Sequence, residues 1–180
     1  YYTLKIASAL ATDENRLNDT VTASILVLPP GPPVNQFCRN GLNILIPAQG
    51  SAPRDSIIVN FSSGYYLLDV NVKIDTVFHT WDSDLIFNIK HGLTNVNIIN
   101  SVGGSGDNFI GTILNDSASI NIGNGTAPFT GSYIPSSSLN VFNGQLANGS
   151  WVLGIDDGAA GDSGVLKAWC IQLIIHALNG

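Results

Sequence analysis

Apolar and polar residues alternate with a period of two along much of this chain. The clearest run is 67–76, in which the apolar residues from Leu68 to Ile74 alternate with polar ones. This period predicts a strand with one face in the core and the other in water. Similar apolar runs predict further strands at 21–28, 42–46, 55–61, 84–90, 95–100, 118–122, 139–142, 150–155 and 165–175.

Turn-forming residues separate these runs. Clusters of Gly, Asn and Ser at 101–108 and 123–126 disfavour helix and mark turns. Asp outnumbers Glu by twelve to one, and the chain holds nineteen Gly and nineteen Asn, a composition typical of turns and strands. The run 169–175 is apolar at both odd and even positions, which predicts a central strand covered on both faces. We therefore predict an all-β fold, a two-sheet sandwich or jelly roll.

The sequence PPGPP at 29–33 marks a boundary between two parts of the chain. Proline-rich segments are stiff and lack backbone donors, so we assign 29–36 to a linker and 37–180 to the main domain. Residues 1–28 have the pattern of a hairpin with a long turn, and two strands alone are marginally stable in water. We interpret them as the closing strands of a preceding immunoglobulin-like domain. The alternative is an extra hairpin docked on the main domain.

Charge and hydropathy exclude two classes of partner. The net charge is −6, and the seven Lys and Arg residues are scattered, whereas phosphate contacts need clustered cations. We therefore expect no nucleic-acid binding. No window approaches the roughly 18 consecutive apolar residues of a membrane-spanning helix. The chain begins at Tyr1 without methionine or a signal-peptide pattern, so we expect a processed fragment of a longer protein.

Familiar catalytic motifs are missing from the sequence. It holds three His residues and no HExxH, paired CxxC or glycine-rich phosphate loop, so zinc catalysis and nucleotide chemistry lack their residues. The string GDSG at 161–164 resembles the nucleophile loop of trypsin-like proteases. A nucleophilic Ser163 would need a histidine base oriented by a carboxylate, and no histidine lies in such a setting. We interpret the string as a turn.

Short carboxylates gather in the predicted loops. Like charges repel unless a cation neutralises them, and Ca²⁺ takes about six to eight oxygen ligands from carboxylates, carbonyls and water. Mg²⁺ fits less well because it demands stricter octahedral geometry. The alternative is ordinary solvated aspartates of turns and strand ends. The loop aspartates are Asp82, Asp84, Asp107, Asp116, Asp156, Asp157 and Asp162.

Two cysteines, Cys38 and Cys170, lie near the start of the main domain and in its last strand. First and last strands are often neighbours in a jelly roll, so we predict a disulfide if the protein is secreted. Such a bridge would close a loop of roughly 130 residues and contribute about 4–5 kcal/mol in the chain-entropy model. The alternative is two unpaired buried thiols.

The aromatic residues divide into two groups. Trp151 and Trp169 sit in apolar strands and are predicted to lie in the core. Trp81 and Tyr133 are flanked by polar loop residues, which makes them candidates for contact with a carbohydrate or a partner. His79 is expected to pin its loop rather than to act in catalysis.

Four stretches of the main domain carry a family resemblance. They are HTWDSDLIFNI (79–89), GGSGDNFIGTILNDSA (103–118), APFTGSYIPSSSLNVFNG (127–144) and NGSWVLGIDDGAAGDSGVLKAWCIQL (148–173). In order and spacing they resemble the P domain, or P/Homo B domain, which follows the catalytic domain in subtilisin-like proprotein convertases and recurs in bacterial secreted proteases. The resemblance covers roughly 37–178, and residues 1–36 resemble the tail of an adhesion-type immunoglobulin-like module.

The resemblance implies a jelly roll of the galactose-binding-like type, with about eight or nine strands and no catalytic activity of its own. It also implies Ca²⁺ binding through loop aspartates. The matching positions are Asp82 and Asp84, with Asp116, Asp157 and Asp162 as further candidates. Animal convertases carry Arg-Gly-Asp where this chain has Asp82-Ser83-Asp84, so no role of that tripeptide is carried over.

We therefore predict a non-catalytic accessory domain of a serine-type endopeptidase of the subtilisin/kexin kind. It would stabilise the protease or present substrate, and its partners would be the catalytic or other domains of the same polypeptide. We expect a monomer, secreted by a bacterium or held at its surface. The alternative is a binding or adhesion module, with carbohydrate as one ligand class. A free-standing hydrolase that uses Ser163 is the third hypothesis.

Overall fold

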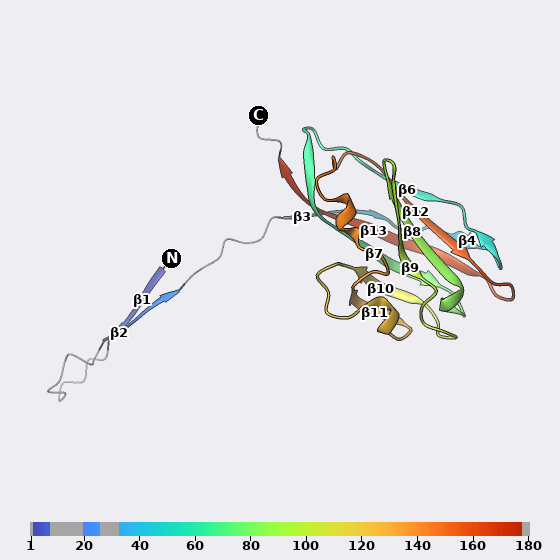
Figure 1. Cartoon of the computed structure of the whole chain (residues 1–180), viewed down its shortest axis with the longest axis horizontal. Helices are drawn as coiled ribbons and strands as arrows, with labels where there is room; N and C mark the ends of the chain where they lie inside the picture. Colours follow the sequence, from blue (N-terminus) through green and yellow to red (C-terminus); the bar gives the residue numbers. More distant parts are fainter. Residues whose placement is uncertain (1, 8–19, 26–32, 178–180) are drawn as a thin grey trace. The chain divides into compact units, whose positions relative to one another are not determined.

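A computed structural model describes residues 2–7, 20–25 and 33–177 of the chain. The chain divides into two units, Tyr1–Pro32 and Pro33–Gly180, each of which is described by itself (Figure 1). Within the described ranges, no helix is long and apolar enough to cross a membrane.

The first unit contains one antiparallel pair of strands. β1 (Tyr2–Ala7) pairs with β2 (Thr20–Ile25), starting with Tyr2 opposite Ile25. The two strands of the predicted hairpin are therefore present and paired. The long turn predicted between them lies outside the described residues, and the origin of this pair in an immunoglobulin-like domain stays a prediction.

The second unit is a β-sandwich of two sheets, with six and five strands. The first sheet has the order β11–β10–β7–β13–β3, with β4 also paired to β13; its strands are β3 (Val34–Arg39), β4 (Ile44–Ile46), β7 (Tyr65–Phe78), β10 (Phe109–Leu114), β11 (Phe129–Tyr133) and β13 (Gly164–Ala177). The second has the order β5–β12–β8–β9, with β6 also paired to β12; its strands are β5 (Gly50–Ser51), β6 (Asp55–Val59), β8 (Leu85–His91), β9 (Thr94–Asn100) and β12 (Gly149–Asp157).

The chain crosses repeatedly between the two sheets, as in a jelly roll. β6 lies in the second sheet, β7 in the first, and β8 in the second again. The predicted all-β sandwich is confirmed. The strands outnumber the eight or so implied by the family resemblance because the sheets include short segments, β4 with three residues and β5 with two.

In strands such as β6 and β8, alternate residues fill the space between the sheets. In β8, Leu85, Phe87 and Ile89 are fully buried, and the residues between them are only half-buried. Trp151 and Trp169 are also fully buried, which confirms their predicted place in the core. Full burial of one large apolar side chain contributes about 1.5–3 kcal/mol, so contact between the sheets is a major source of stability.

The strand predicted at 139–142 is wrong. These residues form the 3₁₀-helix η3 (Leu139–Phe142). The hydroxyl of Ser138, just before it, accepts a hydrogen bond from Asn140 N at 3.2 Å. Such local side-chain bonds compete with strand pairing and favour a turn.

The strand predicted at 118–122 is also wrong. Only a single bridge forms there, between Asn121 and Ile134, and the 3₁₀-helix η2 (Ile122–Asn124) follows. The Asn121 side chain accepts from Gly123 N at 2.9 Å, so the same local competition decides the outcome.

Four strands of the sandwich have no clear period in the sequence and were not predicted: β3, β5, β10 and β11. β3 begins at Val34, so residues 34–36, which we assigned to the linker, belong to the sandwich. β3 lies at the edge of its sheet and most of its side chains are exposed, which removes the apolar signal. In β10 the register with β11 shifts between Phe109 and Thr112, around Gly111, whose φ is +65°.

A buried carboxylate links three strands. Asp55 of β6 is 8% exposed, and one of its oxygens accepts from Trp169 Nε1 at 2.7 Å. The other oxygen lies 3.1 Å from Arg39 Nη2. This contact connects β6 in one sheet with β13 and β3 in the other.

Asp55→Ala should lower the free energy of unfolding by about 1–3 kcal/mol, because the buried N–H of Trp169 would lose its acceptor. Urea denaturation of the two proteins measures the difference. Asp55→Asn keeps an acceptor oxygen and should lower the free energy of unfolding by less. Equal losses for the two variants would show that this hydrogen bond contributes little.

Candidate functional site

Strand register brings two loops together at one end of the sandwich. β12 ends at Asp157, opposite Leu85 of β8, and β13 begins beside the end of β7. The loop 79–84 therefore lies against the loop 158–163, and a backbone hydrogen bond of 2.8 Å joins them. We call these two loops, together with Asp157, the acidic end.

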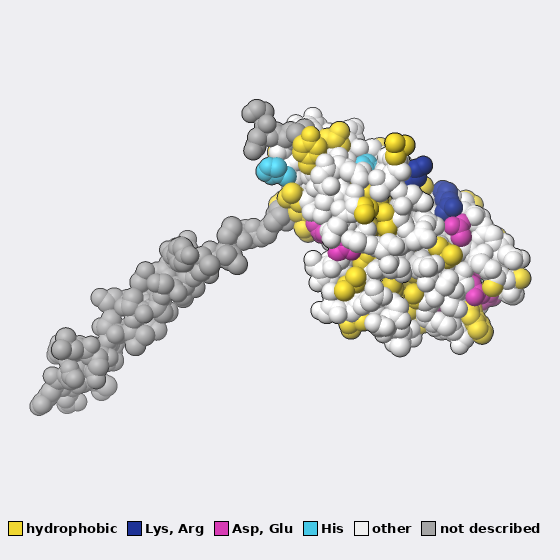
Figure 2. Space-filling view, viewed as in Figure 1, with side chains coloured by type: hydrophobic (Ala, Val, Ile, Leu, Met, Phe, Trp, Pro, Cys, Tyr) yellow, Lys and Arg dark blue, Asp and Glu magenta, His cyan; other side chains and the backbone are white. Residues whose placement is uncertain are grey.

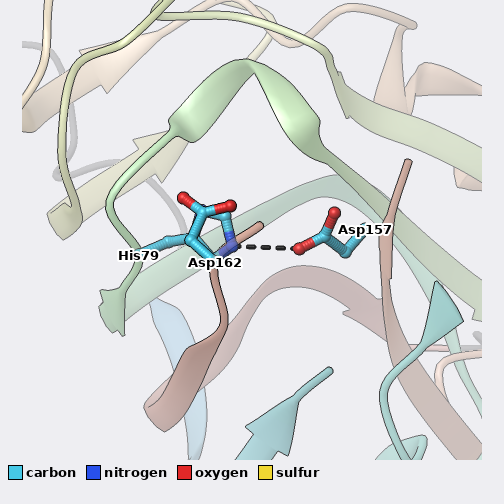
Figure 3. A group of neighbouring side chains, drawn as sticks. All are labelled: His79, Asp157 and Asp162. Atoms are coloured by element: carbon cyan, nitrogen blue, oxygen red, sulfur yellow. Dashed lines mark hydrogen bonds and ion pairs between the residues drawn. The ribbon is translucent and has the colours of Figure 1, made fainter. Parts of the chain in front are cut away.

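His79 is buried in the acidic end, with 2% of its surface exposed. Its Nε2 lies 3.0 Å from Asp157 Oδ2, and its Nδ1 lies against the backbone of Trp81, 3.2 Å from N and 3.0 Å from O. Figure 3 shows the ring directed at Asp157, with Asp162 beside it. Protein groups thus engage both ring nitrogens, and His79 holds Asp157 in place as well as pinning its loop.

The acidic end contains four carboxylates: Asp82, Asp84, Asp157 and Asp162. Asp157 is 3% exposed, and its ligand atom lies within 4.8 Å of those of Asp162 and His79. Thr80 Oγ1 donates to Asp162 Oδ2 at 2.7 Å. Burial, and then the negative charges of Asp157 and Asp162, raise the pKa of Asp84. The acidic end therefore concentrates negative charge on two loops.

Asp82 has a different environment from Asp84. Its side chain is fully buried, and its Oδ1 accepts from Asn108 N at 2.9 Å. Its Oδ2 has no hydrogen-bond partner among the described residues. Burial raises the pKa of Asp82 to about 7, with a further rise from Asp107 and opposing effects of the Asn108 bond and of His79.

A glycine allows this close packing around Asp82. Gly103 has a φ of +93°, and a Cβ at this position would lie 2.7 Å from the Phe129 ring and 3.1 Å from Asp82 Cβ. The loop 103–108 also accepts the backbone N–H of Asp82 through Gly106 O at 2.9 Å. The sequence marked this loop only as a turn, because nothing local shows which carboxylate it will cover.

Asp116 does not join the other aspartates. Its Oδ2 accepts from Ser138 Oγ at 2.7 Å and from Asn140 N at 2.8 Å, and its Oδ1 accepts from Leu139 N at 3.2 Å. These bonds satisfy the first N–H groups of η3, so the carboxylate acts as a cap.

The two aromatic residues predicted for contact lie in different surroundings. Trp81 is 48% exposed and lines a shallow pocket of about 550 Å³ together with Asp84 and Asp162. Tyr133 is half-buried and packs edge-on against Phe129, with 5.8 Å between ring centroids. Of the two, Trp81 is the one that lies beside the acidic end.

Comparisons with known proteins add a weak likeness to two solved structures. No family model and no curated protein matches the chain. A serine protease of Aeromonas sobria, in complex with its chaperone ORF2, aligns with a TM-score of 0.48 and 14% identity over 84% of this chain. The protease alone aligns with a TM-score of 0.47 and 15% identity over 83%. This chain spans 28% of either protease chain, and at this similarity neither family nor function follows.

Proposed function

We propose that the Pro33–Gly180 unit is a non-catalytic accessory domain of the P-domain type, part of a secreted or cell-surface serine endopeptidase, and that its acidic end binds Ca²⁺. The proposal depends above all on three aspartates of the acidic end: the ligand atoms of Asp157 and Asp162 lie within 4.8 Å of each other, and Asp84 lines the same shallow pocket as Asp162. Two of the four stretches that resemble the P domain, 79–89 and 148–173, supply these three residues.

The acidic end suits a cation better than a substrate. Three carboxylates and the carbonyls of irregular loops supply the oxygen-rich surroundings that Ca²⁺ prefers. Burial and the repulsion from Asp157 and Asp162 raise the pKa of Asp84, and a bound cation would offset that repulsion. His79 would act as a positioning residue, because its contact with Asp157 orients that carboxylate.

The contacts of His79 also support a role without bond cleavage. Ser163 lies in the loop between β12 and β13, as the turn interpretation requires. A nucleophilic serine needs a histidine nitrogen free to take its proton, and both nitrogens of His79 are engaged by Asp157 and Trp81. Labelling of Ser163 by a serine-directed phosphonate would contradict this part of the proposal.

The disulfide between Cys38 and Cys170 supports the proposed location. Structural disulfides persist in oxidising compartments and are rare in the cytosol. A secreted or cell-surface protein is therefore the setting that fits this bond.

Added Ca²⁺ should raise the melting temperature of the EDTA-treated protein. A ligand that binds only the folded state stabilises it by about 2.7 kcal/mol at a concentration of 100 times its Kd. Circular dichroism melting curves in EDTA and in Ca²⁺ measure the increment. Asp162→Asn should remove most of it. Asp116→Asn is the matched control: it weakens the cap of η3, so the melting temperature should fall while the Ca²⁺ increment stays.

Identical melting curves in EDTA and Ca²⁺ would overturn the calcium part of the proposal alone. The accessory role has a separate test in the full-length parent protein. Deleting Pro33–Gly180 should reduce the yield or the stability of the active protease. A parent without a protease domain would instead favour the binding or adhesion module.

A further inference from the structure

The outer face of β12 and β8 forms an open groove that the acidic end does not use. The groove has a volume of about 1030 Å³ and is bounded by the β8–β9 hairpin and by the segment 145–149. It is lined by two cationic side chains, Arg54 and Lys90, and by one carboxylate, Asp156. Figure 2 shows Lys and Arg side chains exposed over this part of the domain, with an acidic side chain next to one of them. We call this region the basic groove.

Arg54 is held in a defined position in the basic groove. Its Nη2 lies 3.1 Å from Asp156 Oδ1, and Asn88 Nδ2 donates to Asp156 Oδ2 at 3.2 Å. Gly154 makes room for the guanidinium, since a Cβ there would lie 1.5 Å from Arg54 Nη1. Among the described residues, only Nη2 of the guanidinium takes part in a hydrogen bond, so the other donors can reach a ligand.

Lys90 provides the second cation of the basic groove. It is exposed, and it lies in register with Val152 of β12 and Asn95 of β9. Asn88 and Gly154 form the neighbouring row, about 7 Å away along the strands. No carboxylate of the described residues forms an ion pair with Lys90. The groove thus carries a net charge of one positive unit in a chain whose net charge is −6.

The strand pairing limits the class of ligand. β12 is paired on both sides, to β6 and β8, and β8 is paired to β12 and β9. The backbone groups of the groove floor are therefore used, and a peptide cannot bind there as an added strand. The side chains of the groove must therefore recognise the ligand. The guanidinium and ammonium match a carboxylate, and the amides of Asn88 and Asn95 match hydroxyl groups.

We infer that the basic groove binds an acidic oligosaccharide, with a sugar carboxylate at Arg54 and Lys90 and sugar hydroxyls at the neighbouring amides. An open groove of this volume accommodates several residues of an extended glycan. The inference is independent of the calcium proposal, since the two sites share no residue.

Isothermal titration calorimetry tests the inference. The two ligands, titrated in EDTA, are a hexasaccharide of galacturonic acid and a neutral hexasaccharide. The acidic sugar should bind at least about tenfold more tightly than the neutral one, because its carboxylate gains charge-assisted hydrogen bonds. Lys90→Gln should weaken binding about fivefold or more, and Gly154→Ala should do the same by displacing Arg54. Lys167→Gln, which removes a cation of β13 outside the groove, should leave the affinity unchanged.

Melting temperatures of the variants show whether each is folded, and Lys90→Gln changes only an exposed side chain. The inference is overturned by any of three results: no binding of the acidic sugar at millimolar concentration, equal binding of the neutral sugar, or an unchanged affinity for Lys90→Gln. Equally tight binding of a hexaglutamate peptide would also overturn it, because the groove would then select charge and not sugar.

Discussion

Unfolding of the double variant Cys38→Ala/Cys170→Ala should require about 4–5 kcal/mol less free energy than unfolding of the wild-type chain. The two cysteines are separated by 132 residues in the sequence. In the chain-entropy model, a cross-link over a loop of this length restricts the unfolded chain by about that amount. Guanidinium denaturation of both proteins measures the difference.

Within the folded double variant, the local loss of stability should be greatest in β3. This strand lies at the edge of its sheet and, among the described strands, pairs only with β13, where Cys38 stands directly opposite Cys170. Without the bridge, β3 is held by its backbone pairing with β13 and by the packing of Phe37 against the core. Amide hydrogen exchange should therefore speed up in β3 more than in the central strand β7.

A reducing agent provides the control for this experiment. Dithiothreitol should lower the stability of the wild-type protein to that of the double variant and leave the double variant unchanged. A loss below about 1 kcal/mol would mean that the unfolded chain is already compact, so that the bridge restricts it little.

Asp82→Asn should make the EDTA-treated protein more stable at neutral pH, by roughly 2–4 kcal/mol. The reason is the burial that raises the pKa of Asp82 from 3.8 to about 7, since each pKa unit corresponds to about 1.4 kcal/mol. At and above neutral pH the wild-type protein has to hold a buried, ionised carboxylate. Asparagine keeps the oxygen that accepts from Asn108 N and carries no charge.

The sign of the pH dependence follows from proton binding. Between pH 3.8 and about 7, folded Asp82 keeps a proton that the unfolded chain has released, so this residue makes stability fall as the pH rises. The advantage of Asp82→Asn should be near zero at pH 4 and should grow up to about pH 7. Urea denaturation at several pH values measures it, and parallel curves for the two proteins would refute the assignment.

The strands with a regular period could be predicted from the sequence. β7, β8 and β12 appear close to their predicted ranges, since alternation along a strand directly reflects which face is buried. β13 also appears close to its range, which a continuous apolar run predicted. Edge strands such as β3 could not be found this way, because a strand exposed on most of its surface has no apolar period.

Short polar segments were the second source of error. Ser138 before η3 and Asn121 before η2 use their side chains to bond the backbone two residues later. The apolar residues that follow, including Leu139 and Phe142, are buried from a turn just as they would be from a strand. Apolar spacing alone does not separate these two conformations.

The sequence by itself determined that the main domain is an all-β sandwich with Trp151 and Trp169 in its core, because both properties follow from residue types and their local spacing. Only the tertiary structure decided which side chains act together. The register of β8 with β12 places the loop that carries Asp84 beside Asp157 and the loop that carries Asp162, while Asp116 becomes a cap. Such groupings depend on contacts between residues far apart in the chain, and these contacts leave no periodic trace in the sequence.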